Sequence, residues 1–492
     1  MQIHFWAACL QLATLYLLLG VLFRKLRTPP TDKNKDPILG LDRFQKLYGA
    51  SQTHSFLSES YRRFQSHGAT FRAFLLTSER LYTVDPKNIQ TILSTNARDY
   101  CIGQSRIRAL RPLLGGGALA ATGKPWKRSR ILLKHGLTRI QAVNYQLYER
   151  HFTRLLEKIR MADETVDLQE LFFSMTMDTI CEILFGQLAE SSKTSGCDSP
   201  AEFCRDYDQA QAGALHMIKW GRLTYLSPLQ KFRVLSATTK SRAFVKRLAQ
   251  NALNTHESEA MDKPLPDSLL KQLTSDTSDE RELVDQLFSV LVGGRDTTAS
   301  LLSIQFHILA RRPDIWAKLR DDVAALNGKP PSIQEIRRLK YVSSVVKETL
   351  RLYPAVPRSA RVAVKDTLLP TGGGRDGNNP ILVAKGQTVV LDLFSLHRNK
   401  NTFGDDAEEF RPERWDGIRP GWGYIPFGGG PRLCIGQQMG FMQAMYTTVR
   451  MVQHFDRVCE RDPHEWQELL TFTCASKHGT KVALHPDPAM LH

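Results

Sequence analysis

The sequence predicts a mainly α-helical protein with a smaller β region, preceded by one N-terminal transmembrane helix. Two long segments, 282–312 and 435–455, are apolar on nearly all sides of a helix, which is typical of buried helices. Short β-prone runs at 71–77 and 80–84 alternate with polar turns and indicate a small sheet. An uncharged apolar segment near the start of the chain is long enough to span a membrane.

Composition and charge narrow the class of protein. The 492 residues are 42% hydrophobic and 24% charged, which excludes a disordered or fibrous chain. The net charge of +16 favours anionic partners such as acidic proteins or lipid head groups. Nucleic acid is not expected, because the chain lacks zinc-finger spacing and basic motifs interleaved with aromatic residues. The eight cysteines include no CxxC pair, so neither a zinc site nor a disulfide framework is predicted.

The N-terminal segment from Phe5 to Phe23 is nineteen residues long and carries no charge. At about 1.5 Å per residue, such a helix approaches the ~30 Å hydrocarbon core of a bilayer. Arg24, Lys25 and Arg27 follow at once, so the positive-inside rule places the body of the protein in the cytosol. A cleaved signal peptide is the alternative, but its apolar region would be shorter and would end in small residues. We expect a single-pass anchor in the endoplasmic reticulum membrane, in contact with membrane lipid.

The chain is expected to have three parts. Residues 1–27 form the anchor, 28–60 form a proline-containing linker and the first helical segment, and 61–492 form a single catalytic domain. Two polar stretches, 190–201 and 255–281, are interpreted as exposed connections between helices, because apolar segments resume on both sides of each.

The central buried helix is interrupted by two glycines and ends near Pro313. Gly293 and Gly294 each cost about 1 kcal/mol relative to alanine, so we expect another group to approach the backbone there. Further along, Ser332 and Glu335 predict a capping box, and the helical region that follows runs with a loop or kink to Pro354.

Hairpins are predicted after this region, from residue 355 to 400. The TGGGRDGNN run at 371–379 is interpreted as a surface hairpin loop, because it lacks the Lys-Ser/Thr pair and the strand-to-helix setting of a phosphate loop.

Residues 426–436, PFGGGPRLCIG, surround Cys434 with four glycines and two prolines. Arg432 lies two positions before the cysteine. Glycines let backbone amides and a flat ligand come close, and a nearby cation lowers the pKa of a thiol. The pattern predicts a cysteine held as a thiolate in a backbone-lined loop, with a glycine-rich turn around a buried cysteine as the alternative.

This loop resembles the signature of the cytochrome P450 family of heme-thiolate monooxygenases. The signature positions are Phe427, Gly430, Arg432, Cys434 and Gly436. The resemblance implies a cytochrome P450 fold, heme b as the cofactor and Cys434 as the axial ligand of its iron. It also implies that Arg432 reaches a heme propionate and that Phe427 packs beneath the thiolate.

The KETLR segment is a second match to the family. Glu348 and Arg351 are three residues apart and share a helix face. The resemblance implies that Arg414, in FRPERW, completes their charge network. We interpret these residues as structural rather than catalytic.

The GGRDTT segment, 293–298, resembles the oxygen-activating segment of the family. The resemblance implies that Asp296 and Thr297 relay protons while O2 is activated. The alternative is an ordinary polar patch inside a helix, but a buried acid and hydroxyl are costly without a use. Gly293 stands where the family more often has alanine, which suggests a slightly wider pocket.

Further residues are assigned to heme propionates by the resemblance. In WKRSR, Trp126 and Arg130 lie four apart on one helix face and match a propionate-binding helix. Arg361 stands where another propionate arginine is usual. His397 is a weaker candidate, and a packed histidine is an equal alternative.

The electron source is expected to be a separate protein. The chain has no GxGxxG fingerprint for a nicotinamide or flavin, so the resemblance implies NADPH-cytochrome P450 reductase as partner. Lys127, Arg128 and Lys134 are candidates for its docking patch, with a merely solvated face as the alternative.

The sequence therefore predicts a monooxygenase that oxidises a hydrophobic small molecule with O2. Segments such as 85–100 look most like the fungal branch that hydroxylates alkanes and fatty acids, although the chain departs from that branch at GALAATGKPW, 117–126. The substrate is thus either such a chain or an intermediate of fungal secondary metabolism. A heme-binding sensor or carrier without turnover and a peroxide-rearranging isomerase are the alternatives, and Asp296 with Thr297 argues against a carrier.

Overall fold

The computed structural model describes most of the chain after the predicted anchor. The described residues are 29–32, 40–75, 78–141, 145–162, 164–186, 200–220, 228–258, 268–374 and 376–490. The predicted anchor, residues 1–27, lies outside them. Within the described ranges, no helix combines the length and the apolar character needed to cross a membrane.

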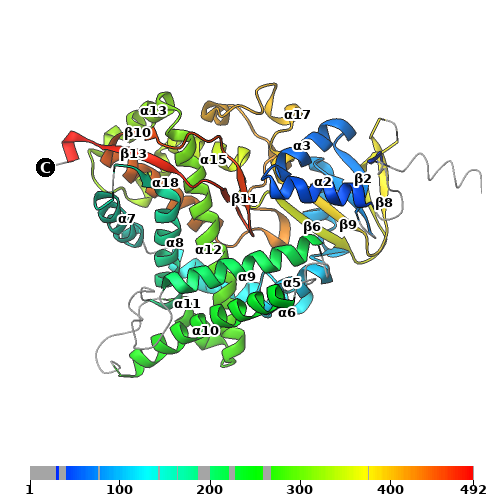
Figure 1. The fold of residues 1–492 in the computed structure, drawn as a ribbon, viewed down its shortest axis with the longest axis horizontal. Helices are drawn as coiled ribbons and strands as arrows, with labels where there is room; N and C mark the ends of the chain where they lie inside the picture. Colours follow the sequence, from blue (N-terminus) through cyan, green and yellow to red (C-terminus); the bar gives the residue numbers. More distant parts are fainter. Residues whose placement is uncertain are drawn as a thin grey trace, which may run out of the picture. The chain divides into compact units, whose positions relative to one another are not determined.

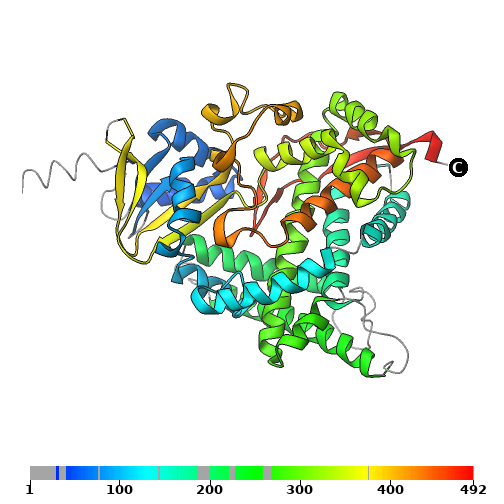
Figure 2. The same cartoon turned by 180° about the vertical axis from the view of Figure 1, so that it is seen from behind.

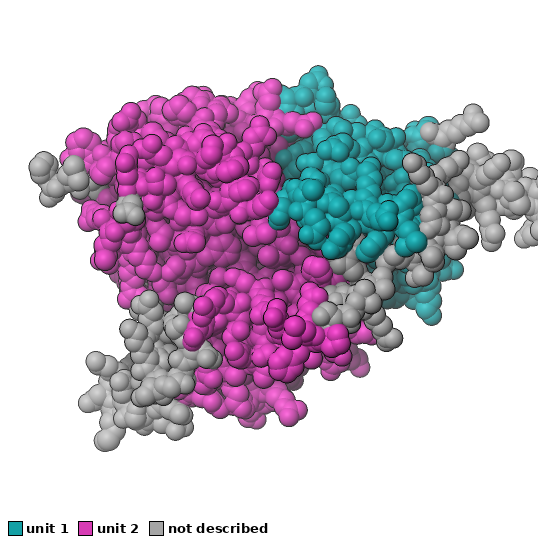
Figure 3. Space-filling model, in the orientation of Figure 1, with its two compact units in different colours: residues 1–102, 358–407, 420–433 teal, residues 103–357, 408–419, 434–492 magenta. Residues whose placement is uncertain are grey.

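The chain forms two compact units, and each combines stretches that are distant in sequence. Unit 1 comprises residues 1–102, 358–407 and 420–433, and unit 2 comprises 103–357, 408–419 and 434–492 (Figure 3). The single domain expected from 61 to 492 stays a prediction.

Unit 1 contains the larger sheet. Its elements are β1 (Thr31–Asp32), α2 (Leu41–Gln52), α3 (Phe56–His67), β2 (Thr70–Leu75), β3 (Ser78–Thr83), α4 (Pro86–Gln90), β4 (Tyr100–Cys101), β6 (Arg358–Ala363), β7 (Thr367–Gly373), β8 (Asn379–Val383), β9 (Thr388–Asp392), α16 (Leu393–Leu396) and α17 (Lys400–Phe403). Short π or 3-10 turns are η1 (Thr91–Thr95), η2 (Ala97–Asp99), η7 (Gly421–Gly423) and η8 (Gly430–Arg432).

Six strands of unit 1 form a mixed sheet in the order β1-β2-β3-β9-β6-β4. The two β-prone runs predicted near 71–77 and 80–84 form β2 and β3, which pair antiparallel with Thr70 opposite Thr83. β9 then pairs parallel with β3. Side chains of these strands are buried in one apolar cluster, including Phe71, Leu81 and Val389. Along β9 the burial does not alternate, because the last four residues of the strand are all buried.

The predicted hairpin region is also confirmed. β7 and β8 pair antiparallel, and the Gly372 amide donates to the Gly377 carbonyl at 2.6 Å across the turn. Both glycines have positive φ, 109° and 73°, which residues with a side chain rarely adopt. The glycine-rich run at 371–379 therefore serves a tight turn.

Unit 2 is mainly helical. Its helices are α5 (Gln104–Leu114), α6 (Gly123–Gln141), α7 (Tyr145–Arg160), α8 (Leu168–Phe185), α9 (Pro200–Trp220), α10 (Pro228–Ser258), α11 (Leu269–Asp276), α12 (Glu280–Leu309), α13 (Pro313–Val323), α14 (Ile333–Arg338), α15 (Lys340–Leu352) and α18 (Gln437–His454). Its strands and 3-10 turns are β5 (Val166–Asp167), β10 (Phe455–Glu460), β11 (Glu468–Leu470), β12 (Cys474–Ser476), β13 (Lys481–Pro486), η5 (Ala324–Leu326), η6 (Pro412–Asp416) and η9 (Pro488–Met490).

The central helix of unit 2 is α12 (Figures 1 and 2). It contacts α8, α10, α15 and α18. Leu287, Phe288 and Leu291 are completely buried in the main apolar cluster of the unit, which explains why the sequence of α12 is apolar nearly all round. The helix α9 lies beside α10 in the same cluster and supplies Phe203 and Tyr207 to it.

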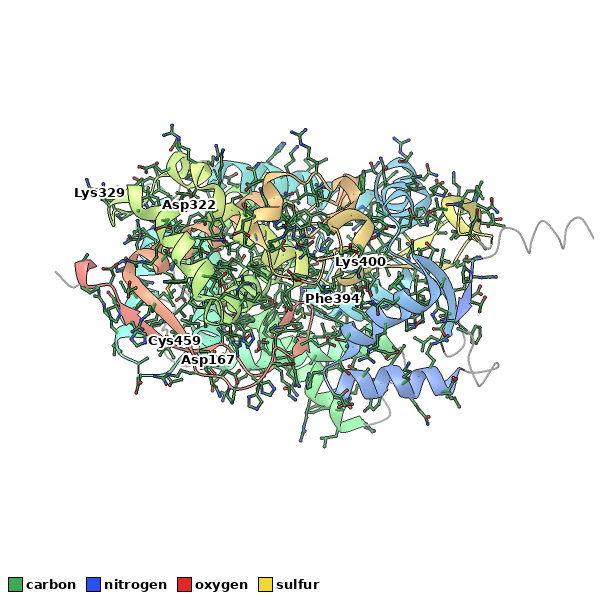
Figure 4. All side chains as sticks on the ribbon, turned by 90° about the horizontal axis from the view of Figure 1, so that it is seen from above. Asp167, Asp322, Lys329, Phe394, Lys400 and Cys459 are labelled. Carbon is green, nitrogen blue, oxygen red and sulfur yellow. The ribbon has the colours of Figure 1, made fainter. Side chains whose placement is uncertain are left out.

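A small antiparallel sheet, in the order β10-β13-β5, joins the start of α8 to the end of the chain. Asp167 caps α8 by accepting from the Gln169 amide at 2.9 Å, and it also accepts from the Thr480 amide at 2.8 Å. Asp167 and Cys459, which belong to β5 and β10, are labelled in Figure 4.

The predicted helices of this unit are largely confirmed. The segments 282–312 and 435–455 form α12 and α18, although Pro313 opens α13 after a short turn rather than ending α12 directly. The capping box is present, since Ser332 and Glu335 each bond the other's backbone amide. The expected loop or kink is the break between α14 and α15 at Leu339.

One predicted connection is wrong. Within the stretch 255–281, residues 269–276 form the helix α11, which is not an exposed link. Leu269, Leu270 and Leu273 are buried, because their spacing places them on one face of the helix. Ser268 caps the helix by accepting from the Lys271 amide at 3.3 Å. The other predicted connection, 190–201, lies almost entirely outside the described residues.

Candidate active site

The two glycines of α12 have different surroundings. A Cβ atom on Gly294 would lie 2.5 Å from Cδ1 of Ile180 on α8, whereas one on Gly293 would meet nothing within 4 Å. The helix is continuous through both residues. The expected close approach thus occurs at Gly294, where α8 packs against α12. The space beside Gly293 is open, and the wider pocket expected from the sequence stays a prediction.

Asp296, a predicted proton donor, is buried in unit 2 and is 2% exposed. The Tyr207 hydroxyl donates to its Oδ2 at 2.7 Å. Gln211 Nε2 donates to the same oxygen at 2.7 Å. Arg295 Nη1 donates to Oδ1 at 2.8 Å. Both carboxylate oxygens are therefore already bonded, which removes most of the cost of burying the charge.

Arg295 extends this network toward the surface. Its Nη1 lies 3.3 Å from Oδ1 of Asp208, whose side chain is 59% exposed. Its guanidinium also lies 5.0 Å and 5.2 Å from the ring centroids of Phe173 and Tyr207. Burial by itself lowers the pKa of Arg295, but the negative charge of Asp296 and its other acidic neighbours outweighs burial and raises it. Arg295 thus stays charged.

Thr297, the second predicted catalytic residue, faces another way. Its hydroxyl donates to the Gly293 carbonyl at 2.8 Å, and the residue is partly exposed. Successive helix residues point about 100° apart, so the side chains of Asp296 and Thr297 diverge. The structure places the two residues next to each other on α12 but does not join their polar groups.

Cys434 lies just before α18, and its side chain is exposed. Surrounding protein nevertheless desolvates the thiol and raises its pKa, while a backbone hydrogen bond from Gly436 and the charge of Arg130 act in the opposite direction. From sequence we expected a cation to lower this pKa. Arg130 does act in that direction, but desolvation by the surrounding protein outweighs it, so the pKa of the thiol is raised overall.

The helix α6 carries the predicted propionate residues on one side and exposed basic residues on the other. The Arg130 guanidinium lies 5.9 Å from the Trp126 ring centroid, and both residues are partly buried. Because Arg130 interacts electrostatically with Cys434, the structure brings α6 and the cysteine together within unit 2. The roles of α6 as a propionate helix and of Cys434 as the iron ligand stay predictions.

The remaining predicted heme residues belong to unit 1. Phe427 and Arg432 are partly buried in the loop before Cys434. Arg361 on β6 donates to the Ser359 hydroxyl and to the Ala360 carbonyl, both at 2.9 Å. His397 is completely buried.

The packed alternative describes His397 well. Its Nε2 accepts from the Ile425 amide at 3.0 Å, and its ring lies 5.3 Å from that of Tyr424. In the same unit, Gly430 has φ of +64°, and a Cβ there would collide with the Leu93 carbonyl. The glycine at this signature position is therefore required by backbone conformation and by packing.

The predicted charge network around Glu348 is confirmed. Arg351 donates to both carboxylate oxygens at 2.9 Å and 2.8 Å, and Arg414 Nε donates at 2.7 Å. Sequence reasoning did not include the Trp415 indole, which donates at 3.0 Å, or the Arg411 amide at 2.9 Å. Glu348 and Arg351 are completely buried.

The predicted docking patch on α6 is less basic than expected. Lys127, Arg128 and Lys134 are all exposed. However, Arg128 donates to both carboxylate oxygens of Glu282 on α12, at 2.6 Å and 2.9 Å, so its charge is neutralised locally. The two lysines are the better candidates for contact with an acidic partner.

Three polar residues of the site were missed from the sequence. Tyr207, Asp208 and Gln211 lie on α9 and reach the network of Asp296. The spacing of Tyr207 and Gln211 places them on one helix face, but nothing in the sequence indicates which helix that face meets.

The residues around Cys434 fit a heme group. A thiolate is a ligand of heme iron, and a guanidinium such as that of Arg130 pairs well with a carboxylate such as a propionate. Cys434 is an exposed residue, and Arg130 lies within electrostatic reach of its thiol.

Comparison with known proteins identifies the family of the chain. A family model described as cytochrome P450 matches residues 40–482. The cytochrome P450 monooxygenase himC of Aspergillus japonicus is 38% identical over 463 residues, covering 92% of this chain and 82% of that protein. The cytochrome P450 monooxygenase fsdH of Fusarium heterosporum is 37% identical over 448 residues, covering 87% and 78%. Cytochrome P450 52A5 of Candida maltosa is 36% identical over 485 residues, covering 93% and 91%.

The matches and the helical fold define a heme-dependent oxidoreductase that uses O2. The chain belongs to the cytochrome P450 family. It is a monooxygenase that carries heme b and acts on a hydrophobic substrate with electrons from a redox partner. The predicted mainly helical fold with a smaller sheet region is that of the family.

Proposed function

We propose that Cys434 is the axial ligand of the heme iron. The observation that carries this assignment is the position of Cys434, an exposed residue just before α18 that lies within electrostatic reach of Arg130. Trp126 and Arg130 in unit 2, and Arg361, Phe427 and Arg432 in unit 1, are the proposed heme-binding residues.

When bound, the heme supplies the iron at which O2 is activated. Cys434 would hold the iron as a thiolate, the form that a metal cation stabilises. Arg130 would hold a propionate. Asp296 and Thr297 are the proposed residues that hold and move protons, and the open space beside Gly293 lies one helical turn before Thr297.

The enzyme is proposed to be anchored in the endoplasmic reticulum membrane through residues 5–23 and to receive electrons from NADPH-cytochrome P450 reductase. The uncharged segment with its following basic residues supports the anchor. The net charge of +16 and the exposed Lys127 and Lys134 support docking of an acidic donor.

Two substrate classes are proposed: a fatty-acid or alkane chain, or an intermediate of fungal secondary metabolism. The loop that departs from the alkane-hydroxylating pattern packs directly on α12. The Gly116 amide donates to Asp285 Oδ2 at 2.6 Å, and a Cβ on Gly117 would collide with Ser289. Changes in this loop therefore act close to the central helix, which supports an altered substrate range.

The test is turnover by the full-length protein in membranes with its reductase and NADPH. Fatty acids, alkanes and an extract of fungal metabolites are supplied in parallel, and products are followed by mass. We expect a product heavier by one oxygen atom and dependent on NADPH. A Cys434→Ser variant should form none, and turnover by that variant would overturn the assignment of the iron ligand. NADPH consumption without product from any pool would contradict both substrate classes.

A further inference from the structure

One face of α9 is directed at the carboxylate of Asp296. Tyr207 and Gln211 are one helical turn apart, both are buried, and both donate to the same oxygen, Oδ2, at 2.7 Å. This geometry holds the carboxylate toward α9. It therefore faces away from the hydroxyl of Thr297, which donates to the Gly293 carbonyl instead.

The network also contains two buried polar atoms that remain unbonded. Among the described residues, neither Gln211 Oε1 nor Arg295 Nε has a hydrogen-bond partner. Buried donors and acceptors are normally paired, so one spare acceptor and one spare donor beside the same carboxylate need an explanation. These two atoms can form other hydrogen bonds, so the network can rearrange. A carboxylate that takes up and releases a proton requires such a rearrangement.

We propose that Tyr207 and Gln211 are positioning residues that hold the Asp296 carboxylate on the α9 side of α12 and set how readily it takes up a proton. The inference rests on the proposed role of Asp296 in proton delivery. Neither residue touches the reacting atoms in this account, and both act through the carboxylate.

The hydrogen-bond donors around Asp296 keep their protons, so the bonds that they donate control how readily its carboxylate takes up a proton. Arg295 stays charged, as described above. Burial and then the charge of Asp296 raise the pKa of Tyr207, so its hydroxyl keeps the proton that it donates.

Two thiols and one exposed acid complete the surroundings. Cys204 on α9 interacts electrostatically with Asp296, and burial raises its pKa. Burial also raises the pKa of Cys181 on α8, which faces Arg295. Both thiols are therefore neutral near pH 7. Asp208 pairs with Arg295. It also interacts electrostatically with Asp296, and burial raises the pKa of Asp208.

The first test is the pH profile of product formed per NADPH consumed, with Tyr207→Phe. Removing a donor to the charged form makes the carboxylate bind its proton more readily. We expect the alkaline limit of coupled turnover to move upward by about one pH unit, a tenfold change in proton concentration, with substrate KM unchanged within about twofold. An unmoved profile, or one moved downward, would overturn the proposal.

The matched control is Tyr446→Phe. Tyr446 donates to Glu149 at 2.6 Å, and Arg450 also binds that carboxylate, so the same atom is removed from a similar cluster. Its pH profile should stay that of the unchanged protein. An equal shift in both variants would mean that the effect is general and would refute the positioning role.

A second readout does not depend on activity. Unfolding by denaturant is measured for the full chain with heme bound, for Tyr207→Phe, Asp296→Asn and the double variant. We expect the two changes to be non-additive by at least about fivefold in the unfolding equilibrium constant, as for residues in direct contact. Additive effects would contradict the contact.

Gln211→Leu, which removes one neutral donor, replaces Tyr207→Phe in both tests if the latter fails to fold. If the wild-type protein shows no turnover, the proposed function is wrong. The denaturation measurements still test whether Tyr207 and Asp296 interact.

Discussion

Two buried carboxylates in unit 2, Glu348 and Asp296, are held in different ways. Glu348 binds two arginines, Arg351 and Arg414, together with an indole and a backbone amide. Asp296 binds one arginine and two neutral side chains. The partners of Glu348 come from α15 and the segment around η6, whereas those of Asp296 come from α9 and α12.

The difference between the two clusters lies in their spare bonding capacity. Among the described residues, no side chain of the Glu348 cluster has a buried polar atom without a partner, whereas the Asp296 cluster has two such atoms. A cluster in which every polar atom is hydrogen-bonded has no spare donor or acceptor with which to rearrange, so it stabilises one conformation of the fold. An incompletely bonded cluster next to an exposed acid, Asp208, can rearrange at lower cost. We infer that the first is structural and the second functional.

The largest effect is expected from Glu348→Gln. It leaves two buried guanidinium groups without a full counter-charge, and breaking such a cluster costs about 3–5 kcal/mol of unfolding free energy. We expect little folded, heme-loaded protein, measured as heme per polypeptide and by denaturant unfolding. The matched control is Glu413→Gln in the exposed pair with Lys318, 2.7 Å apart, where the loss should stay below about 1 kcal/mol. Equal losses of unfolding free energy in the two variants would contradict the structural role of Glu348.

A smaller loss of stability, but a loss of function, is expected from Asp296→Asn. The amide keeps the shape of the side chain but loses charge-assisted hydrogen bonds worth about 1.5–3 kcal/mol each before compensation. Heme content should be retained, while product formation falls on the order of 100-fold, as for removal of a general acid. Retention of full product formation per NADPH would show that the cluster has no role in proton delivery.

The smallest effects are expected from removing one neutral donor in each cluster. Trp415→Phe removes a donor to Glu348, and Gln211→Leu removes a donor to Asp296, each at a cost of about 1.5–3 kcal/mol of stability, as for one hydrogen bond to a charged group. The two variants should therefore unfold at similar denaturant concentrations. Only Gln211→Leu should change the ratio of peroxide released to NADPH consumed. A change of that ratio in both variants, or in neither, would erase the distinction between the clusters.

The elements fixed by local pattern could be predicted from the sequence. The pair of Glu348 and Arg351 follows from three-residue spacing on a helix, and α12 and α18 follow from continuous apolar runs. The helix α11 was missed because Leu269, Leu270 and Leu273 are embedded in a polar stretch, and their burial depends on distant helices.

The surroundings of the site residues could not be predicted, because they depend on contacts between distant segments. Tyr207 and Gln211 lie 89 and 85 residues before Asp296, and no motif joins them. The same holds for Cys434, whose neighbouring cation in unit 2 is Arg130 on α6. Its raised pKa reflects desolvation by the folded protein, which residue spacing does not reveal.

The central claim is that Cys434 binds heme iron through sulfur, and the most direct measurement is the absorption spectrum of the reduced, carbon monoxide-bound full-length protein. We expect the red-shifted Soret band typical of sulfur ligation, its loss in Cys434→Ser and its retention in Cys459→Ser. A colourless protein, or a red-shifted band that survives Cys434→Ser, would show that Cys434 is not the iron ligand.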